Sequence, residues 1–340
     1  MPPDTTSKPA DAAHEPPPRV RFAAPRLNVC VLGGTGFVGS EIVARLADAG
    51  HWVRVPTRAA SHGQHLAVLP TVQLVVADPA GTGALAGLLA GMDAVINLIG
   101  ILNESRGARF RDVHAGLAAR LIEEARAARV PRLLHMSAAG ADAERAPSRY
   151  LRSKGKAQAL VRAAAPSLDV TIFRPSVIFG PGDSLTERFV RLLQLGGGLL
   201  PLARPRARFA PVYVGDVARA FVQALGDRAT VGRTYELCGP DVLTLEQIVR
   251  ETAAAAATRC RIVPLPDFLA RIEALVLGRM PGKPFTLDNF RSLTIDSLCR
   301  EDGLAHLGIE PQRMAAVLPT YLGDMRLSDR LNRFRVEGER

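Results

Sequence analysis

The sequence predicts an α/β protein in which a doubly wound parallel sheet is followed by a smaller C-terminal domain. Three observations predict this fold class. After residue 26 the chain shows a strand, a glycine-rich turn, a helix and a second strand. Apolar, strand-like runs then alternate with helical stretches as far as residue 175, an order typical of parallel sheets. The length of 340 residues is enough for two domains.

The first strand, turn and helix are predicted at residues 27–50. Residues 27–32 are an apolar, strand-like run, and the helix after the turn ends at Gly50. A second strand at 53–55 completes a strand–helix–strand unit. One face of the helix carries the apolar side chains of Val38, Ile42, Val43 and Leu46.

The turn itself is rich in glycine. A side chain at Gly34 or Gly36 would hold the backbone away from a bound pyrophosphate, and Gly39 lets the helix pack closely on the strand. The first amides of the helix can donate hydrogen bonds to phosphate oxygens. The turn therefore predicts an NAD(P)-binding Rossmann domain, with cofactor contacts at Gly33, Thr35, Gly36, Phe37, Val38 and Gly39.

The choice between NAD(H) and NADP(H) depends on the second strand. An NAD site usually has an acidic residue about 20 residues after the glycines, where it binds the ribose 2′-hydroxyl. No acidic residue occurs between His51 and Ala77, whereas Arg54 and Arg58 lie in or just after the strand. Arg58 is placed to pair with a 2′-phosphate, and the alternative is an exposed loop arginine. We therefore predict NADP(H) rather than NAD(H) as the cofactor.

Four further strands are predicted at 72–77, 94–99, 132–136 and 170–173, with a helix at 110–129. The apolar stretch 84–102 is predicted to be a helix and a buried strand rather than a membrane span, because Gly91 and Asp93 interrupt it. Ligands of such sheets bind at the carboxyl ends of the strands. The residues expected to contact the cofactor there are Asp78, Asn97, Leu98, Ile99, Gly100 and Pro175. Capping of a turn is the alternative role for Asp78.

Several motifs along the chain are those of one large enzyme superfamily. They are the glycine turn at 33–39, the strand at 96–100, the sequence Tyr-Leu-Arg-Ser-Lys at 150–154, and the segments 174–183 and 211–218. On these motifs the sequence resembles the short-chain dehydrogenase/reductase superfamily, in its extended or atypical branch, from about residue 27 to 322. More narrowly, it resembles the branch that contains the NADPH-binding accessory subunit of respiratory complex I, its bacterial relatives and a relative in coenzyme Q synthesis.

Tyr150 and Lys154 are the predicted catalytic pair. Residues four apart on a helix share a face, so the ammonium of Lys154 is expected to lie beside the phenol of Tyr150 and to lower its pKa. The resemblance implies that Lys154 also binds the nicotinamide ribose and that Tyr150 protonates the carbonyl that receives the hydride. A pair on the helix surface without function is the alternative.

The third catalytic residue implied by the resemblance is a hydroxyl that steadies the substrate oxygen. Ser137, after the fifth strand, is the candidate. In many relatives the hydroxyl comes from the second or third residue of this stretch, where this chain has Ala138 and Ala139. A site without the hydroxyl is therefore the alternative. His114 falls near a position where many extended members carry Asn, and we predict a buried structural histidine.

The composition argues against several classes of protein. The formal net charge is +10, but aromatic residues make up only 5% of the chain and do not alternate with basic residues. No nucleic-acid partner is therefore expected. The cysteines show no paired spacing, so we expect no metal site, no redox motif and a reducing cytoplasm. They are Cys30, Cys238, Cys260 and Cys299.

The domain boundaries follow from these predictions. Residues 1–26 lack the apolar run of a signal peptide and are expected to be a disordered leader, and 326–340 are expected to be a tail. The Rossmann domain is predicted at 27–180, with 212–239 returning to it. The smaller substrate or partner domain is predicted at 181–211 and 240–325.

Three features of the smaller domain stand out. Five arginines and no carboxylate lie in 188–212, which indicates either an anionic substrate or phospholipid headgroup, or solvated loop arginines. Residues 244–247 fit a capping box that opens a helix through 257. Residues 267–277 form a short amphipathic helix that is a lid, a docking face or ordinary core. Its apolar side carries Phe268, Ile272, Leu275 and Val276.

Two classes of function remain open. The first is an NADP(H)-dependent oxidoreductase, epimerase or dehydratase that acts on a small molecule, anionic or quinone-like, in quinone or respiratory-chain metabolism. The second is a non-catalytic module that holds NADPH, as the complex I resemblance implies. Tyr150 and Lys154 favour the first class, and Ala138 and Ala139 favour the second. A cytoplasmic location is expected, with peripheral association with the membrane or with respiratory machinery.

Overall fold

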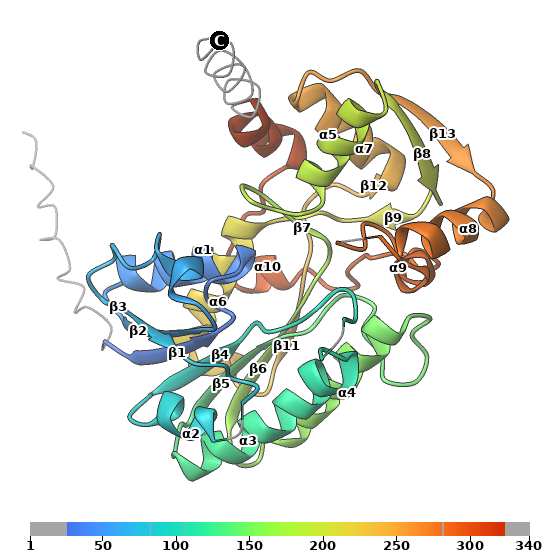
Figure 1. Cartoon of the computed structure of the whole chain (residues 1–340). Coiled ribbons are helices and arrows are strands. Elements are labelled where there is room, and N and C mark those ends of the chain that lie inside the picture. Colours follow the sequence, from blue (N-terminus) through green and yellow to red (C-terminus); the bar gives the residue numbers. More distant parts are fainter. Residues whose placement is uncertain (1–25, 82, 106, 281, 324–340) are drawn as a thin grey trace, which may run out of the picture.

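A central sheet of seven parallel strands organises the protein. The computed structural model describes residues 26–81, 83–105, 107–280 and 282–323. The spatial order of the strands is β11-β6-β5-β4-β1-β2-β3 (Figure 1). The chain winds outward from β1 in both directions, which confirms the predicted doubly wound sheet. The strands are β1 (Asn28–Leu32), β2 (Trp52–Thr57), β3 (Val72–Val76), β4 (Ala94–Asn97), β5 (Arg132–Met136), β6 (Asp169–Pro175) and β11 (Thr234–Leu237).

Helices cover both faces of this sheet (Figure 1). On one face Ile42 and Phe221 are fully buried in one apolar core, and on the other Leu121 and Val161 are buried in a second. Burial of these two cores supplies the main driving force for the sheet to form. The first face is covered by α1 (Phe37–Asp48) and α6 (Val214–Gly226), and the second by α2 (Ala84–Leu89), α3 (Leu117–Ala127) and α4 (Arg149–Ala163).

Several predicted boundaries differ from the structure by a few residues, and two of the differences lie beside the candidate site. β4 ends at Asn97 because its side chain accepts a hydrogen bond from the backbone amide of Ile99 (3.2 Å) and turns the chain. The helix predicted at 110–129 is divided, because Arg111–Gly116 form a π-helical turn before α3. This wider turn lets Phe110 and His114 both face α4, where both are buried. Such turns are common at functional sites.

Most of the remaining elements pack around a third apolar core, whereas Leu304 of α10 (Gly303–His306) belongs to the core on the first face of the sheet. Phe179, Val190 and Ile248 are among the buried residues of the third core. Three two-stranded sheets join β7 (Ile178–Phe179) to β10 (Val212–Tyr213), β9 (Arg208–Phe209) to β12 (Leu243–Thr244), and β8 (Leu199–Ala203) to β13 (Arg261–Leu265). The helices are α5 (Thr186–Leu195), α7 (Leu245–Ala255), α8 (Asp267–Leu277), α9 (Leu287–Ser292) and α10 (Gly303–His306).

The capping box predicted at 244–247 is confirmed. The amide of Gln247 donates to Thr244 Oγ1 (3.2 Å), and the amide of Thr244 donates to Gln247 Oε1 (2.7 Å). These reciprocal bonds satisfy two amides that a helix start leaves unpaired, and they fix the beginning of α7.

A disulfide joins Cys238, directly after β11, to Cys299. The sequence analysis did not predict this bond, because the spacing of the cysteines gives no sign of it. They are separated by 61 residues, and only the return of the chain to the end of β11 brings them together. Cys30 and Cys260 are free thiols.

The stretch 84–102 and the two ends of the chain were also given predictions. The stretch 84–102 contains α2 and β4, as predicted, and none of the helices in the described part of the chain has the length and apolarity to cross a bilayer. Apart from Arg26, the expected leader lies outside the described residues, and so does the expected tail at 326–340.

Candidate active site

The glycine turn between β1 and α1 serves both packing and ligand access. A Cβ at Gly39 would lie 2.1 Å from the carbonyl oxygen of Gly33, and one at Gly34 would lie 2.8 Å from Val55 Cγ1. These glycines are therefore required by the close approach of helix and strand. A Cβ at Gly36 would meet only the Gly33 oxygen, at 3.3 Å. The space in front of Gly36, at the N-terminus of α1, is thus free for a phosphate group.

The segment 98–100 connects this turn to the predicted catalytic helix. A Cβ at Gly33 would lie 3.3 Å from the backbone nitrogen of Ile99. A Cβ at Gly100 would lie 3.2 Å from Lys154 Nζ and 3.3 Å from His114 Nε2. The structure therefore brings the glycine turn, the end of β4 and Lys154 of α4 together at one edge of the sheet, where ligands of such folds bind.

Lys154 is buried in this place. Its side chain is 3% exposed, and its ammonium donates a hydrogen bond to the carbonyl of Met136 (2.9 Å). Burial lowers the pKa of Lys154 to about 8. An ammonium has three donors, and among the described residues only Met136 accepts one. Two donors thus remain for a ligand.

Tyr150 lies on the same helix, in an apolar setting. Its ring centroid is 6.0 Å from that of Phe110 and 5.7 Å from that of His114. Burial raises the pKa of Tyr150 to about 12, so the prediction that Lys154 lowers it is wrong. Loss of water around the phenol disfavours its charged phenolate form. The phenol is therefore protonated at neutral pH and can donate a proton.

Ser137 and two histidines complete the surroundings of Lys154. Ser137 Oγ is buried without a hydrogen-bond partner among the described residues, which leaves it available to a ligand oxygen. His114 is buried, as predicted: its Nε2 accepts from the amide of Ile101 (3.1 Å), and its Nδ1 contacts Ser153 Oγ (2.7 Å). Burial and the charge of Lys154 lower the pKa values of His114 and His135 to about 3, so both are neutral.

The predicted residues at the ends of β2 and β3 have different surroundings. Arg58 is exposed and has no hydrogen bond or ion pair with any described residue. Arg54, in contrast, donates to the carbonyls at the end of α2, including that of Leu88 (3.0 Å). Asp78 is exposed and accepts from the amide of Ala80 (3.0 Å), so it caps its own turn. Of these side chains, Arg58 is the one free to bind a phosphate.

Asn97 and Pro175 support the backbone at the strand ends. Asn97 Nδ2 contacts His135 Nδ1 (3.3 Å), and its Oδ1 accepts from Ile99, so both polar ends of this buried side chain are engaged. The carbonyl of Pro175 accepts from the amide of Ala139 (2.8 Å). Both residues thus shape the edge on which Leu98, Ile99 and Gly100 lie.

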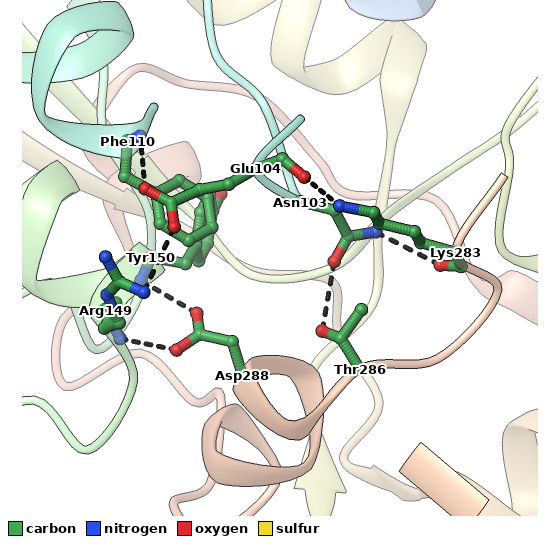
Figure 2. A network of polar contacts seen from close by, with 8 residues as sticks. All are labelled: Asn103, Glu104, Phe110, Arg149, Tyr150, Lys283, Thr286 and Asp288. Carbon is green, nitrogen blue, oxygen red and sulfur yellow. Dashed lines mark hydrogen bonds and ion pairs between the residues drawn. The ribbon is translucent and has the colours of Figure 1, made fainter. Parts of the chain in front are cut away.

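The first turn of α4 is capped from a distant part of the chain. The Asp288 carboxylate of α9 accepts from the backbone amides of Arg149 (2.8 Å) and Tyr150 (2.9 Å) (Figure 2). Glu104 pairs with Arg149 Nη1 at 3.1 Å. The sequence analysis missed Asp288, because 138 residues separate it from Tyr150 and no local pattern joins them.

Further polar contacts hold the same segment against the loop after β4. Thr286 Oγ1 donates to Asn103 Oδ1 (3.1 Å), and Lys283 Nζ donates to the carbonyl of Glu104 (Figure 2). A cavity of about 410 Å³ lies beside this network, with Phe110 in its wall. Because the Phe110 ring also contacts Tyr150, the cavity adjoins the side of the site that carries the phenol.

Four of the five arginines in the segment 188–212 have partners in the structure. Arg208 forms an ion pair with Asp296 (2.7 Å), and Arg204 forms one with Asp267. Arg191 pairs with Glu187, and Arg188 donates to the carbonyl of Pro284 (2.7 Å). Carboxylates outside the segment therefore neutralise charges that the local sequence leaves unpaired. Among these five arginines only Arg206 lacks a partner among the described residues.

Comparison with known proteins agrees with this architecture. Residues 29–238 match the NAD dependent epimerase/dehydratase family. The chain is 33% identical to "NADH dehydrogenase [ubiquinone] 1 alpha subcomplex subunit 9, mitochondrial" of Arabidopsis thaliana, over 81% of this chain and 71% of that protein. It is 32% identical to "Ceramide reductase" of Caulobacter vibrioides, over 70% of this chain and 74% of that protein.

Solved structures share the fold. One is DesIV, a dTDP-glucose 4,6-dehydratase of Streptomyces venezuelae with NAD and TYD bound, which superposes with a TM-score of 0.68 at 23% identity. The superposition covers 88% of this chain and 97% of that one. These matches confirm the predicted resemblance to the complex I subunits and to the epimerases and dehydratases. The chain belongs to the NAD dependent epimerase/dehydratase family, the extended branch of the short-chain dehydrogenases and reductases.

Proposed function

We propose that this chain is an NADP(H)-dependent oxidoreductase in which Tyr150 and Lys154 act on a small carbonyl or alcohol substrate. One observation carries the proposal. The segment 98–100 has the glycine turn on one side and the buried ammonium of Lys154 on the other. A ligand held at the N-terminus of α1 therefore has Lys154 only one segment away, and Tyr150 lies one helical turn from Lys154, against His114.

Residues from several elements would hold the cofactor. The amides at the start of α1 and the free space at Gly36 suit the pyrophosphate. Lys154 has donors for the nicotinamide ribose. The exposed, unpartnered guanidinium of Arg58 suits the 2′-phosphate that distinguishes NADP(H) from NAD(H). When bound, the nicotinamide supplies or accepts the hydride.

The side chains of this site would move the proton. Tyr150 is protonated at neutral pH and can donate its proton to a carbonyl oxygen as the carbonyl carbon is reduced. The ammonium of Lys154, one helical turn away, then stabilises the phenolate. Ser137 Oγ, buried and unpartnered, is a free donor for the same substrate oxygen. Phe110 shields the phenol from water.

The second candidate function is a non-catalytic module that holds NADPH. Two observations favour it: the similarity to complex I subunits of mitochondria, and the alanines at 138 and 139, where many relatives place the hydroxyl. In this alternative Lys154 binds the cofactor and the phenol of Tyr150 has no chemical role.

The substrate and the partners are part of the proposal. The pairing of Arg204 and Arg208 argues against their binding an anionic substrate. The adjoining cavity is lined by apolar side chains, among them Phe110, Leu275 and Leu287, and by charged ones: Glu104, Arg149, Arg279, Lys283 and Asp288. A quinone-like substrate, with an apolar body and polar oxygens, suits this mixed lining. We propose a cofactor domain at 27–180 with 212–239, and a substrate domain at 181–211 and 240–325. Peripheral association with a membrane or with respiratory machinery is a separate proposal that does not depend on the chemistry of Tyr150 and Lys154.

The nucleotide carried by the purified protein distinguishes the two candidates. Reversible binding of NADPH, with an empty protein after dialysis, is expected for an enzyme. NADPH that stays bound in near-equal molar amount indicates the module. Gly36→Val tests the site itself: the new side chain would obstruct the pyrophosphate, so NADPH binding should be lost in either case. Unchanged binding would exclude the proposed cofactor site.

A further inference from the structure

Helix α8 is built with its small residues inward and its large apolar residues outward. Ala270 and Ala274 are its buried residues, with 0% and 1% exposure. At 100° per residue the opposite side is apolar and exposed. We call this side the α8 face; its residues are Phe268 (64% exposed), Leu269 (40%), Ile272 (55%), Leu275 (45%), Val276 (57%) and Met280 (48%).

This arrangement overturns the interpretation of the helix as ordinary core. An amphipathic helix on a globular protein turns its large apolar side chains inward. Here Phe268, Ile272, Leu275 and Val276, the apolar stripe predicted from the sequence, all lie at the surface. Apolar patches of this kind mark sites of association.

We propose that the α8 face docks on the surface of a lipid bilayer that contains anionic phospholipids. The charges around it favour this occupant. Arg271 on the helix and Arg279 just after it are exposed, and so are Arg259 and Arg261, before and at the start of β13, the strand that precedes α8. The segment 259–280 has only two carboxylates: Asp267 is paired with Arg204, and burial raises the pKa of Glu273. An apolar helix face bordered by arginines is typical of helices that lie in the membrane interface.

The position of the face suits such a docking. Through Ala274, Leu275, Gly278 and Arg279, the helix also forms a wall of the 410 Å³ cavity beside Phe110. Leu275 belongs both to that wall and to the exposed face. A bilayer against the α8 face would therefore bring the cavity close to the lipid surface. An apolar substrate could then reach the site without crossing water. This route rests on the proposed function, whereas the docking does not.

Vesicle flotation tests the docking with the full chain. We expect the protein to float with phosphatidylcholine vesicles that contain about one third phosphatidylglycerol, and much less with phosphatidylcholine alone. Ile272→Asp with Val276→Asp should weaken binding by at least about tenfold. Val68→Asp with Val242→Asp is the matched control, because these valines are 79% and 56% exposed elsewhere on the surface. Arg271→Gln and Arg279→Gln should each weaken binding about fivefold, on anionic vesicles only.

Three results would overturn the docking proposal. If the wild-type protein does not float, or if the control pair loses as much binding as the α8 pair, the docking proposal is wrong. A dimer in light scattering that the α8 substitutions convert to a monomer, without vesicle binding, would assign the face to a second copy and also overturn it. NADPH titration of the same variants separates the two proposals: intact flotation without NADPH binding refutes only the proposed function.

Discussion

Replacing Lys154 by methionine is expected to make the unliganded protein more stable, although we propose that this residue binds the cofactor. The ammonium is 3% exposed, and burial lowers its pKa from 10.5 to about 8. The folded protein therefore binds fewer protons than the unfolded chain between these two pH values. Wild-type stability should rise as the pH increases from 8 to 10.5, because the unfavourable buried charge is removed.

The size of the expected stabilisation follows from the shift in the pKa of Lys154. A difference of about 2.5 pH units corresponds to about 3 kcal/mol at pH 7, at about 1.4 kcal/mol per unit. Methionine removes this penalty but leaves the carbonyl of Met136 without its donor, which costs about 1 kcal/mol. We therefore expect Lys154→Met to be about 2 kcal/mol more stable than the wild type at pH 7. For a chain of 340 residues this corresponds to a melting temperature about 3 °C higher.

Urea unfolding at pH 7 and pH 9.5 measures this effect. The advantage of the variant should fall to near zero at pH 9.5, as Lys154 loses its proton in the folded state. Lys156→Met is the matched control, because Lys156 lies on the same helix but is exposed, and it should show no such pH dependence. A variant less stable than the wild type at pH 7, or an advantage that does not change with pH, would refute the reasoning. The same variant should bind NADPH more weakly.

Other substitutions test the remaining assignments. Arg58→Gln should weaken NADPH binding by about 10 to 100-fold in a fluorescence titration and leave NADH binding unchanged; an equal loss for both would remove the 2′-phosphate assignment. Tyr150→Phe should retain NADPH affinity and lower turnover by about 10² to 10⁴-fold, whereas full complementation of a deletion strain would favour the non-catalytic module. Asp288→Ala should lower the free energy of unfolding by about 2 kcal/mol, because two amides of α4 lose a charged acceptor, and Asp288→Asn should lose less. Reducing the bond between Cys238 and Cys299 should lower stability by about 4 kcal/mol, the value expected for a loop of this length; no change in the urea midpoint on adding reductant would contradict it.

Much of the sheet could be predicted because each strand and helix carries its own periodicity. Arg132–Met136 was predicted with both ends correct, and the parallel, doubly wound sheet follows from the alternation of strands and helices. The turn at 33–39 could be assigned because glycine has few substitutes where helix and strand approach closely.

The rest of the site depends on contacts between distant parts of the chain. The spacing of Tyr150 and Lys154 identifies two neighbours on a helix, but the phenol's pKa is set by burial against Phe110 and His114, which spacing does not reveal. Likewise Arg208 acquires its partner Asp296 from 88 residues further along the chain. Local charge counts therefore left a site for an anionic ligand open beside solvated loop arginines, and the folded chain pairs three of these arginines with carboxylates outside the segment.

The cap on α4 also has a consequence for the order in which the protein is made. Asp288 is synthesised 139 residues after Arg149, and its carboxylate accepts a hydrogen bond from the backbone amide of Arg149. At about 5–20 residues per second, the ribosome needs some tens of seconds or less to bridge that gap. During this interval the strands up to β6 and the local cap at Ser148 can already form, while the turn that carries Tyr150 still lacks its outer acceptor. A nascent chain would thus form most of its Rossmann sheet before the turn that carries Tyr150 is fixed.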